Sequence, residues 1–209
     1  GKILDVGCGS GEFLECLMGL GYIDITGIEP TSMAAEYASK AFAGRVNIVN
    51  DVFENVKLGC NSYNVITFWE VLSRLTLPEK VLEKAFLCLG DKGLLFISSP
   101  NIAGFEYQML GEHHFDIKFD IAKYFNIDTM TRLLERIGFK IVEISTPGRL
   151  DMEHVRSEVL LMPDKVKIPP FIEKIIMDES EDGNLKRDDF QAYLSKHNLS
   201  GSMLIIARK

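Results

Sequence analysis

The most informative segment of this chain is Lys2-Ile-Leu-Asp-Val-Gly-Cys-Gly-Ser-Gly-Glu-Phe13. Its residues 3–6 form a short, mostly apolar run, as in a buried strand. Gly7, Gly9 and Gly11 follow at alternate positions, and the residues after them have the apolar spacing of a helix. A strand, a glycine loop and a helix form the first half of a nucleotide-binding βαβ unit. Because such glycines let the main chain approach a ligand closely, we predict a ligand here rather than an empty tight turn.

The spacing of the glycines indicates which ligand binds. The pattern G-x-G-x-G differs from the dinucleotide fingerprint G-x-G-x-x-G, and no Lys follows it as in a Walker loop. The sequence Asp5-Val-Gly-Cys-Gly-Ser-Gly11 closely resembles the first motif of class I S-adenosylmethionine-dependent methyltransferases. The resemblance implies that this loop surrounds the methionine and ribose parts of S-adenosylmethionine. It implies cofactor contacts for Asp5, Gly7, Cys8, Gly9, Ser10 and Gly11. Binding of NAD by an oxidoreductase is the alternative.

Composition limits the classes of protein that the chain can belong to. With 209 residues and 46% hydrophobic composition, it can bury one substantial core. Its net charge is −7 and its basic residues do not cluster, so we expect no nucleic-acid partner. No apolar run approaches the roughly 18 residues of a membrane span, so we expect no membrane partner. Four cysteines without C-x-x-C spacing suggest a reduced, cytoplasmic chain without structural zinc. The chain starts almost inside its first strand, so we expect the helical cover that precedes this strand in relatives to be missing.

Acidic residues follow the second and third predicted strands. Glu29 ends the strand 25–28 and lies 18 positions after Gly11, near the offset of about 20 at which an acid binds ribose hydroxyls. Pro30 then ends the strand beside the cofactor. After the strand 46–49, the resemblance implies that Asp51 binds the adenine amino group and that Val52 contacts the ring. An Asp in a strand-end turn also has local reasons to occur.

The fourth predicted strand, 63–69, brings aromatic and acidic residues to the same edge. Phe68, Trp69 and Glu70 stand at its carboxyl end, where ligands bind in open α/β sheets. We expect the methionine end of the cofactor to pass here, with an aromatic face beside the sulfonium. The alternative for Trp69 is simple packing under the next helix.

The residues that follow argue against a metal site. Relatives similar to ubiquinone-type methyltransferases usually read Glu-x-x-Glu-His here, whereas this chain reads Glu70-Val-Leu-Ser73-Arg74. A hard divalent ion prefers oxygen ligands without an adjacent cation, so we predict no metal and disfavour methylation of a quinone ring. The Asn/Asp-Pro-Pro-aromatic motif of amino-methylating nucleic-acid enzymes is replaced by Thr67-Phe-Trp-Glu70, which disfavours base methylation.

The acceptor site is expected in the segment 102–125, which follows the fifth predicted strand, 94–98. This segment reads as irregular and is rich in aromatic residues, Phe119 among them, and in histidine. Loops at the ligand edge of a rigid sheet usually hold substrate. His113 and His114 are the candidate general bases, because an imidazole titrates near pH 6.5. We expect at most one of these neighbours to face the acceptor.

The rest of the chain completes an α/β fold. A helix over 78–89 and a helix capped by Asp128 and closed by Gly138 are predicted, followed by strands over 140–145 and 203–207. The long connection 146–202 contains enough apolar residues to pack as a helical insertion. We expect it to close the acceptor pocket or to form a contact in a homodimer.

Further resemblance points to a substrate class. The stretches 124–126, 133–139, 146–151 and 199–209 resemble a bacterial methyltransferase subgroup often linked to polysaccharide biosynthesis. Relatives place a His just before Tyr124, and Ile121 takes that place here. The resemblance implies a sugar or polysaccharide precursor as acceptor.

We therefore predict a single α/β methyltransferase domain over 1–209, doubly wound around a seven-stranded, mostly parallel sheet. The resemblance implies the strand order 3-2-1-4-5-7-6 with an antiparallel last strand. The expected reaction is methyl transfer from S-adenosylmethionine to an oxygen or nitrogen of a small molecule. The alternatives are an NAD-dependent oxidoreductase and a catalytically silent cofactor-binding subunit.

Overall fold

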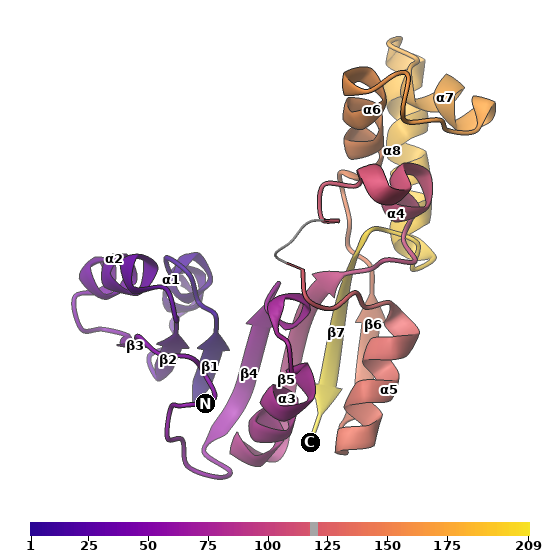
Figure 1. Cartoon of the computed structure of the whole chain (residues 1–209). Helices are drawn as coiled ribbons and strands as arrows, with labels where there is room; N and C mark the ends of the chain where they lie inside the picture. The colour runs from indigo at the N-terminus through magenta and orange to yellow at the C-terminus, as the bar shows by residue number, and fades with distance from the viewer. Residues whose placement is uncertain (118–120) are drawn as a thin grey trace.

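Seven strands form one sheet in the order β3-β2-β1-β4-β5-β7-β6 in the computed structural model, which describes residues 1–117 and 121–209 (Figure 1). The strands are β1 Ile3–Val6, β2 Ile25–Ile28, β3 Asn47–Val49, β4 Tyr63–Trp69, β5 Leu89–Pro100, β6 Lys140–Ser145 and β7 Ser202–Arg208. β7 is antiparallel to β5 and β6, and the other neighbouring pairs are parallel. The predicted fold class and strand order are confirmed. Phe119 of the aromatic segment lies outside the described residues.

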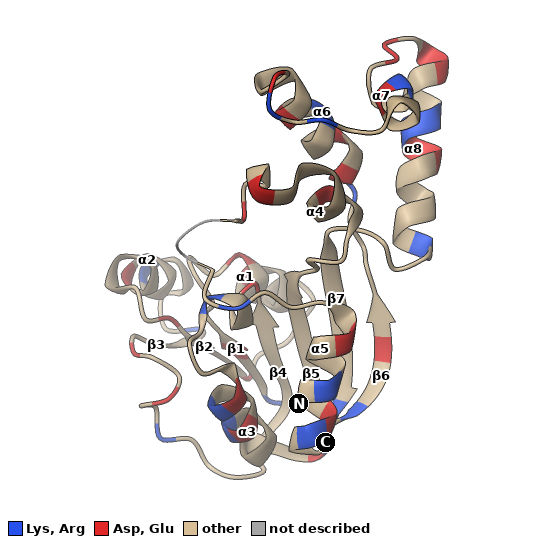
Figure 2. Cartoon of the chain, turned by 45° about the vertical axis from the view of Figure 1, so that its right-hand side comes forward, with Lys and Arg blue, Asp and Glu red and all other residues tan. Residues whose placement is uncertain are grey.

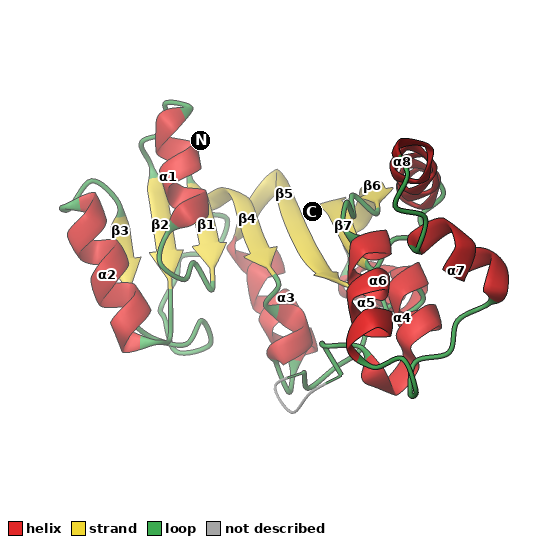
Figure 3. Ribbon diagram, turned by 90° about the horizontal axis from the view of Figure 1, so that it is seen from above, coloured by secondary structure: helices red, strands yellow, loops and turns green. Residues whose placement is uncertain are grey.

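Helices connect these strands and cover the sheet. The helices are α1 Glu12–Gly19, α2 Ser32–Phe42, α3 Pro78–Cys88, α4 Phe105–Leu110, α5 Ile127–Ile137, α6 Asp151–Leu161, α7 Pro170–Ile176 and α8 Glu181–Lys196, with short 3₁₀ turns η1 Leu72–Arg74 and η2 Gly111–His113. α1 lies on the opposite side of the sheet from α3 and α5 (Figure 3). The main core fills the space between the sheet and α3 and α5, and includes Leu4, Ile66, Phe68, Leu95 and Leu134.

Two sequence predictions about helices need correction. The helix predicted to be capped by Asp128 begins at Ile127, and Asn126 caps it by accepting a hydrogen bond from the Thr129 N–H at 2.8 Å. The segment 102–125, predicted to be irregular, contains α4. Phe105 and Leu110 are buried on this helix because they pack against apolar residues of the distant helices α6–α8, a partner that local spacing does not reveal.

Helices α4, α6, α7 and α8 form a helical cap beyond the carboxyl ends of β5 and β6 (Figure 1). The helical cap has its own core, which includes Phe105, Met152, Val155, Ile176 and Leu194. α6, α7 and α8 all belong to the connection between β6 and β7. Basic and acidic side chains alternate along α3, α5 and α8 (Figure 2). Within residues 1–117 and 121–209, no helix combines the length and apolar character needed to cross a membrane.

The register of the central strands places the predicted site residues at one edge. Val6 of β1 pairs with Ile28 of β2 on one side and with Phe68 of β4 on the other. Because these three strands are parallel, the residues that follow them emerge side by side. The glycine loop, Glu29 and Trp69 therefore meet at the carboxyl edge of the sheet, where open α/β sheets bind ligands.

Candidate active site

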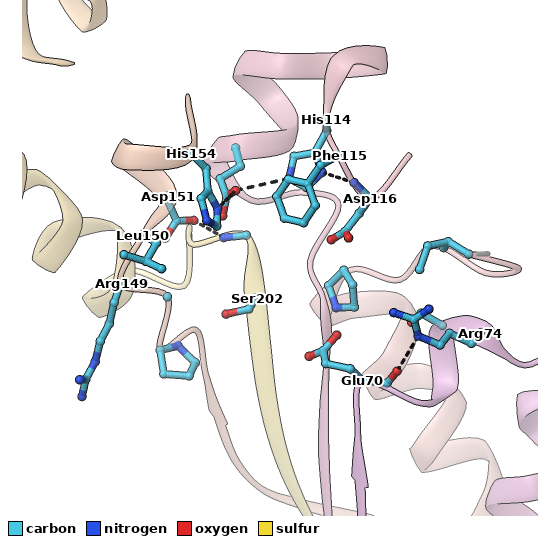
Figure 4. Close-up of a pocket in the computed structure, with 17 residues that line it drawn as sticks. Glu70, Arg74, His114, Phe115, Asp116, Arg149, Leu150, Asp151, His154 and Ser202 are labelled. Carbon is cyan, nitrogen blue, oxygen red and sulfur yellow. Dashed lines mark hydrogen bonds and ion pairs between the residues drawn. The ribbon is translucent and has the colours of Figure 1, made fainter. Parts of the chain in front are cut away.

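Two cavities lie at the carboxyl edge of the sheet. The glycine-loop cavity has a volume of about 440 Å³ and is bounded by the ends of β1, β2 and β4. The cap cavity, also about 440 Å³, lies between the helical cap and the ends of β4 and β5 (Figure 4). Glu70 and Arg74 line both cavities. The two spaces therefore share a boundary at the end of β4.

The glycine loop adopts a backbone that other residues rarely take. Gly7, Gly9 and Gly11 have φ values of +75°, +55° and +98°, in the left-handed region that favours glycine. A β-carbon on Gly7 would lie 2.5 Å from a methyl of Val71, whereas on Gly9 it would meet only a carboxylate oxygen of Glu12, at 4.0 Å. Gly7 is thus required by packing within the protein. Gly9 instead leaves space through which a ligand can approach the main chain.

Glu29 joins the end of β2 to the glycine loop. One carboxylate oxygen accepts a hydrogen bond from the Gly9 N–H at 2.9 Å, and the other accepts one from the Thr31 N–H at 2.8 Å. The side chain is buried and lines the glycine-loop cavity together with Pro30. A carboxylate oxygen can accept more than one hydrogen bond, so both oxygens keep capacity for hydroxyl groups.

Asp51 and Val52 follow β3, and of these two only Val52 lines the glycine-loop cavity. Asp51 Oδ1 accepts hydrogen bonds from the Val52 N–H at 2.7 Å and from Asn55 Nδ2 at 2.9 Å. Both contacts are local, as is common for an Asp in the turn after a strand. Val52 lines the glycine-loop cavity and is 41% exposed. Asp51 is absent from the described lining of that cavity.

Six other predicted cofactor residues are absent from the described lining of the glycine-loop cavity: Asp5, Cys8, Gly9, Ser10, Gly11 and Phe68. Phe68 is fully buried and contacts Phe53 edge-on, with ring centroids 6.0 Å apart. Cys8 is buried, and its desolvation raises the pKa of the thiol to about 12. Ser10 and Gly11 line a separate depression between α1 and α2. Asp5 is buried as well.

Asp5 is a buried carboxyl group behind the glycine loop. It is 2% exposed, and Thr67 Oγ1 donates a hydrogen bond to its Oδ1 at 2.6 Å. Burial, opposed by this hydrogen bond and reinforced by the charge of Glu29, raises the pKa of Asp5 to about 6. The structure therefore holds a carboxyl that titrates close to neutral pH next to the predicted ligand loop.

Trp69 and Glu70 stand at the end of β4, and Glu70 belongs to the boundary between the two cavities. The Trp69 ring packs edge-on against Phe13, with centroids 5.0 Å apart, and also lines the glycine-loop cavity. Glu70 has φ +56°, a strained value for a non-glycine residue and one that is frequent at ligand sites. Ser98 Oγ donates to Glu70 Oε1 at 2.8 Å. Burial raises the pKa of Glu70, although Ser98 and Arg74 oppose this effect.

The opposite wall of the cap cavity carries a cluster of carboxyl and imidazole groups (Figure 4). Glu106 Oε2 on α4 lies 2.8 Å from Nδ1 of His154 on α6 and 3.4 Å from Nε2 of His114. Burial tends to raise the pKa of Glu106, but the two imidazoles outweigh it and hold this pKa below its usual value. Burial and the neighbouring Glu106 raise the pKa of Asp151, against hydrogen bonds from Gly201 and Gln191.

The two histidines predicted as bases are in different positions. His114 is 3% exposed and lines the cap cavity. His113 is absent from the described lining, and its Nε2 lies 3.9 Å from a carboxylate oxygen of Glu112. Sequence reasoning did not identify Glu106, Asp151 or His154 as site residues. The scarcity of histidine could have drawn attention to His154, because the chain contains only four histidines.

The sheet order, the glycine loop and the cavity beside it define a class I S-adenosylmethionine-dependent methyltransferase. The family model described as a methyltransferase domain (Methyltransf_23) matches residues 1–144, and the chain belongs to this family. The chain therefore carries the methyltransferase domain of this family. This assignment replaces the NAD-dependent alternative.

Curated relatives carry a more specific name. The chain is 34% identical over 117 residues to the ubiquinone biosynthesis O-methyltransferase of Glaesserella parasuis serovar 5 (strain SH0165). The matched region covers 52% of this chain and 49% of that protein. The chain is 30% identical over 140 residues to the mitochondrial ubiquinone biosynthesis O-methyltransferase of Saccharomyces cerevisiae, covering 60% of this chain and 44% of that protein. The chain thus spans about half the length of these relatives.

Solved structures share the fold. A SAM-dependent methyltransferase from Archaeoglobus fulgidus superposes with a TM-score of 0.67 at 20% identity, over 100% of this chain and 86% of that one. Phosphoethanolamine N-methyltransferase 2 from Haemonchus contortus, solved in complex with S-adenosyl-L-methionine, gives a TM-score of 0.64 at 12% identity, over 100% of this chain and 48% of that one.

Proposed function

We propose that this chain transfers a methyl group from S-adenosylmethionine to an oxygen or nitrogen of a small polar molecule. In this proposal the donor binds in the glycine-loop cavity and the acceptor binds in the cap cavity. The carrying observation is that Glu70 and Arg74 line both cavities. Methyl transfer needs the donor and the acceptor atom held in line at close range, and a shared boundary makes that arrangement available.

The residues around the glycine-loop cavity suit the cofactor. Gly9 leaves the main chain open to close approach, and Glu29 keeps acceptor capacity for ribose hydroxyls. Val52 offers an apolar surface beside an adenine ring, and Trp69 offers an aromatic face to a sulfonium. When bound, S-adenosylmethionine supplies an electrophilic methyl group on a positively charged sulfur.

The cap cavity favours a hydroxyl-rich acceptor over a quinone ring. Its lining includes the charged or polar side chains of Glu70, Arg74, Asp116, Arg149, His154 and Ser202. Hydroxyl groups can pair with such side chains, whereas an apolar ring would cover their donors and acceptors without pairing them. We therefore propose a sugar or polysaccharide precursor as the acceptor class, in contrast to the ubiquinone pathway named for the curated relatives. Asp151 and His154 of α6 contribute to this wall, which supports a role for the insertion in closing the acceptor pocket.

The first test measures cofactor binding. S-adenosylhomocysteine should raise the melting temperature, because a ligand selective for the folded state stabilises it, and NAD should not. Glu29→Gln should weaken binding of S-adenosylhomocysteine by about 1–3 kcal/mol, since a hydrogen-bonded charge is lost. Glu36→Gln, at an exposed ion pair with Lys40 on α2, is the matched control and should bind as the parent does.

The acceptor class is tested with labelled S-adenosylmethionine and fractionated metabolite extracts. We expect the label in small polar, hydroxyl-bearing products identified by mass and fragmentation. Stabilisation by NAD without stabilisation by S-adenosylhomocysteine would refute the cofactor site. Recovery of the label only in apolar quinol-type products would refute the proposed acceptor class.

A further inference from the structure

We propose that His154 is the general base that removes the proton from an acceptor hydroxyl, and that Glu106 is the positioning residue that orients it. The proposal rests on the proposed function, because it places the acceptor in the cap cavity. It narrows that function to O-methylation and assigns the base to the helical insertion, outside the segment 102–125.

The contacts of His154 define its tautomer. Its Nδ1 lies 2.8 Å from Glu106 Oε2. Because an ionised carboxylate only accepts hydrogen bonds, Nδ1 must carry the proton. The lone pair of the neutral ring is then on Nε2, which has no hydrogen-bond partner in the described part of the chain. The side chain is 38% exposed and lines the cap cavity, so this lone pair is available to a bound molecule.

His114 is engaged in a different way. Its Nδ1 accepts a hydrogen bond from the Asp116 N–H at 3.1 Å, so the neutral ring carries its proton on Nε2. That nitrogen faces Glu106 Oε2 at 3.4 Å, which is long for a hydrogen bond and makes the contact mainly electrostatic. The ring is stacked on Tyr107 and on Phe115, with centroids 3.7 and 4.5 Å away. His114 therefore has no lone pair free for a substrate and acts as a second support for Glu106.

Glu106 is held firmly enough to orient a base. It is 7% exposed, and a β-carbon on Gly201 would lie 2.6 Å from its Oε1, so the start of β7 packs directly against the carboxylate. The charge of Glu106 helps to raise the pKa of the neighbouring Asp151, whereas the two imidazoles lower the pKa of Glu106 itself. Glu106 therefore holds a negative charge that faces the imidazole that would become cationic.

Several ionisable groups surround the His154 ring or line the same cavity. They are Glu106 on α4, His114 and Asp116 in the segment after α4, Arg149 and Asp151 at the start of α6, and Glu70 and Arg74 at the end of β4. Glu106 makes the shortest polar contact with the ring. Its removal is therefore the change that should most affect the orientation of the His154 ring.

The reaction balances without another reactant. The acceptor oxygen forms a bond to the methyl carbon, and the carbon–sulfur bond breaks with its electron pair remaining on sulfur. The hydroxyl proton passes to Nε2 of His154, and solvent later removes it. The imidazolium that forms meanwhile is paired with Glu106, an arrangement of base and orienting carboxylate that suits general-base catalysis.

The test uses four forms of the full chain: the parent, His154→Ala, Glu106→Gln and the control His197→Ala. His197 follows α8 and packs against Tyr193, with ring centroids 4.3 Å apart and the ring planes tilted by 38°. It is absent from the described lining of the cap cavity. We expect His154→Ala to lower turnover about 10²–10⁴-fold without changing the dissociation constant of S-adenosylhomocysteine. Added imidazole should restore part of the rate, and His197→Ala should match the parent.

Nuclear magnetic resonance of ¹⁵N-labelled histidine gives a readout that does not depend on activity. We expect the neutral His154 ring of the parent to carry its proton on Nδ1. The pH–rate profile of Glu106→Gln should differ from that of the parent, whereas the profile of His197→Ala should match it. A proton on Nε2 of His154, or an unchanged pH–rate profile in Glu106→Gln, would overturn the assignment.

The outcomes separate this proposal from the proposed function. If the parent transfers methyl groups and His154→Ala keeps its turnover within a few-fold, only the assignment of the base is overturned. If the parent methylates only nitrogen atoms, the proposed function stands and the assignment of the base is overturned. If the parent binds S-adenosylhomocysteine but methylates neither an oxygen nor a nitrogen in any extract, the proposed function itself fails, and the assignment of the base fails with it.

Discussion

Replacing Asp5 by Asn should stabilise the protein at neutral and alkaline pH and leave its stability nearly unchanged at pH 4. The buried carboxyl of Asp5 has a pKa of about 6, against an ordinary value of 3.8. Between these two values the folded state holds the proton more tightly than the unfolded state does. The free energy of unfolding must therefore fall as the pH rises from 4 to 6, because the carboxyl loses its proton and the native state then has to bury a negative charge.

The pKa values give the size of the effect. A difference of about two pKa units corresponds to about 3 kcal/mol, at roughly 1.4 kcal/mol per unit. Asn has nearly the same shape as Asp, and its side-chain oxygen can still accept the hydrogen bond from Thr67. We thus expect a gain of up to about 3 kcal/mol at pH 7.5 that shrinks towards zero at pH 4.

Urea unfolding of the parent and of Asp5→Asn, measured at half-unit intervals from pH 4 to pH 8, is the appropriate assay. Asp24→Asn changes an exposed carboxyl immediately before β2 and is the matched control, which should follow the parent throughout. A stability difference between Asp5→Asn and the parent that does not change with pH would refute the reasoning. If Asp5 contacts the cofactor, the stabilised variant should also bind S-adenosylhomocysteine more weakly.

Two further predictions concern the cap cavity. Gly201→Ala should lower the free energy of unfolding by about 1–3 kcal/mol and reduce methyl transfer, because the new methyl would lie 2.6 Å from Glu106 Oε1. Urea unfolding and initial rates test this prediction, and values of both that match the parent would contradict it. Methyl transfer should be unchanged by EDTA or by added Mg²⁺. The Arg74 guanidinium donates a hydrogen bond to the Glu70 carbonyl oxygen and stands beside the Glu70 carboxylate, and this positive charge disfavours a divalent cation there. A rate abolished by EDTA and restored by Mg²⁺ would contradict this prediction.

The sequence allowed much of the sheet to be predicted because its signals are local. The segment 2–13 contains a strand, a glycine loop and a helix start within a few residues, and the structure has β1, three left-handed glycines and α1 there. The order of the strands came from resemblance, and it is confirmed. By contrast, α4 was missed because its apolar residues are buried by α6–α8, far away in the sequence.

The cluster around Glu106 could not be predicted for a related reason. Glu106 and His154 are 48 positions apart, and no spacing rule links a residue after the fifth strand to one in a long insertion. The histidine pair His113-His114 drew attention because it is visible in the sequence. Which imidazole has a free nitrogen depends on the Asp116 N–H and on the Glu106 carboxylate, and these contacts exist only in the folded chain.

The joint between the sheet and the helical cap explains why the cluster lies where it does. Three connections cross there at close range: a β-carbon on Gly104 would lie 2.5 Å from the Ser200 carbonyl oxygen, and one on Gly148 would lie 2.6 Å from Ser200 Cβ. The Gly201 N–H donates to Asp151 at the same crossing. Glu106 and Asp151 are thus fixed at the base of the helical cap, where it meets the sheet. Gln191 and Ser195 of α8 both donate hydrogen bonds to the Gly148 carbonyl oxygen, so α8 is tied to the same crossing that holds Glu106 and Asp151.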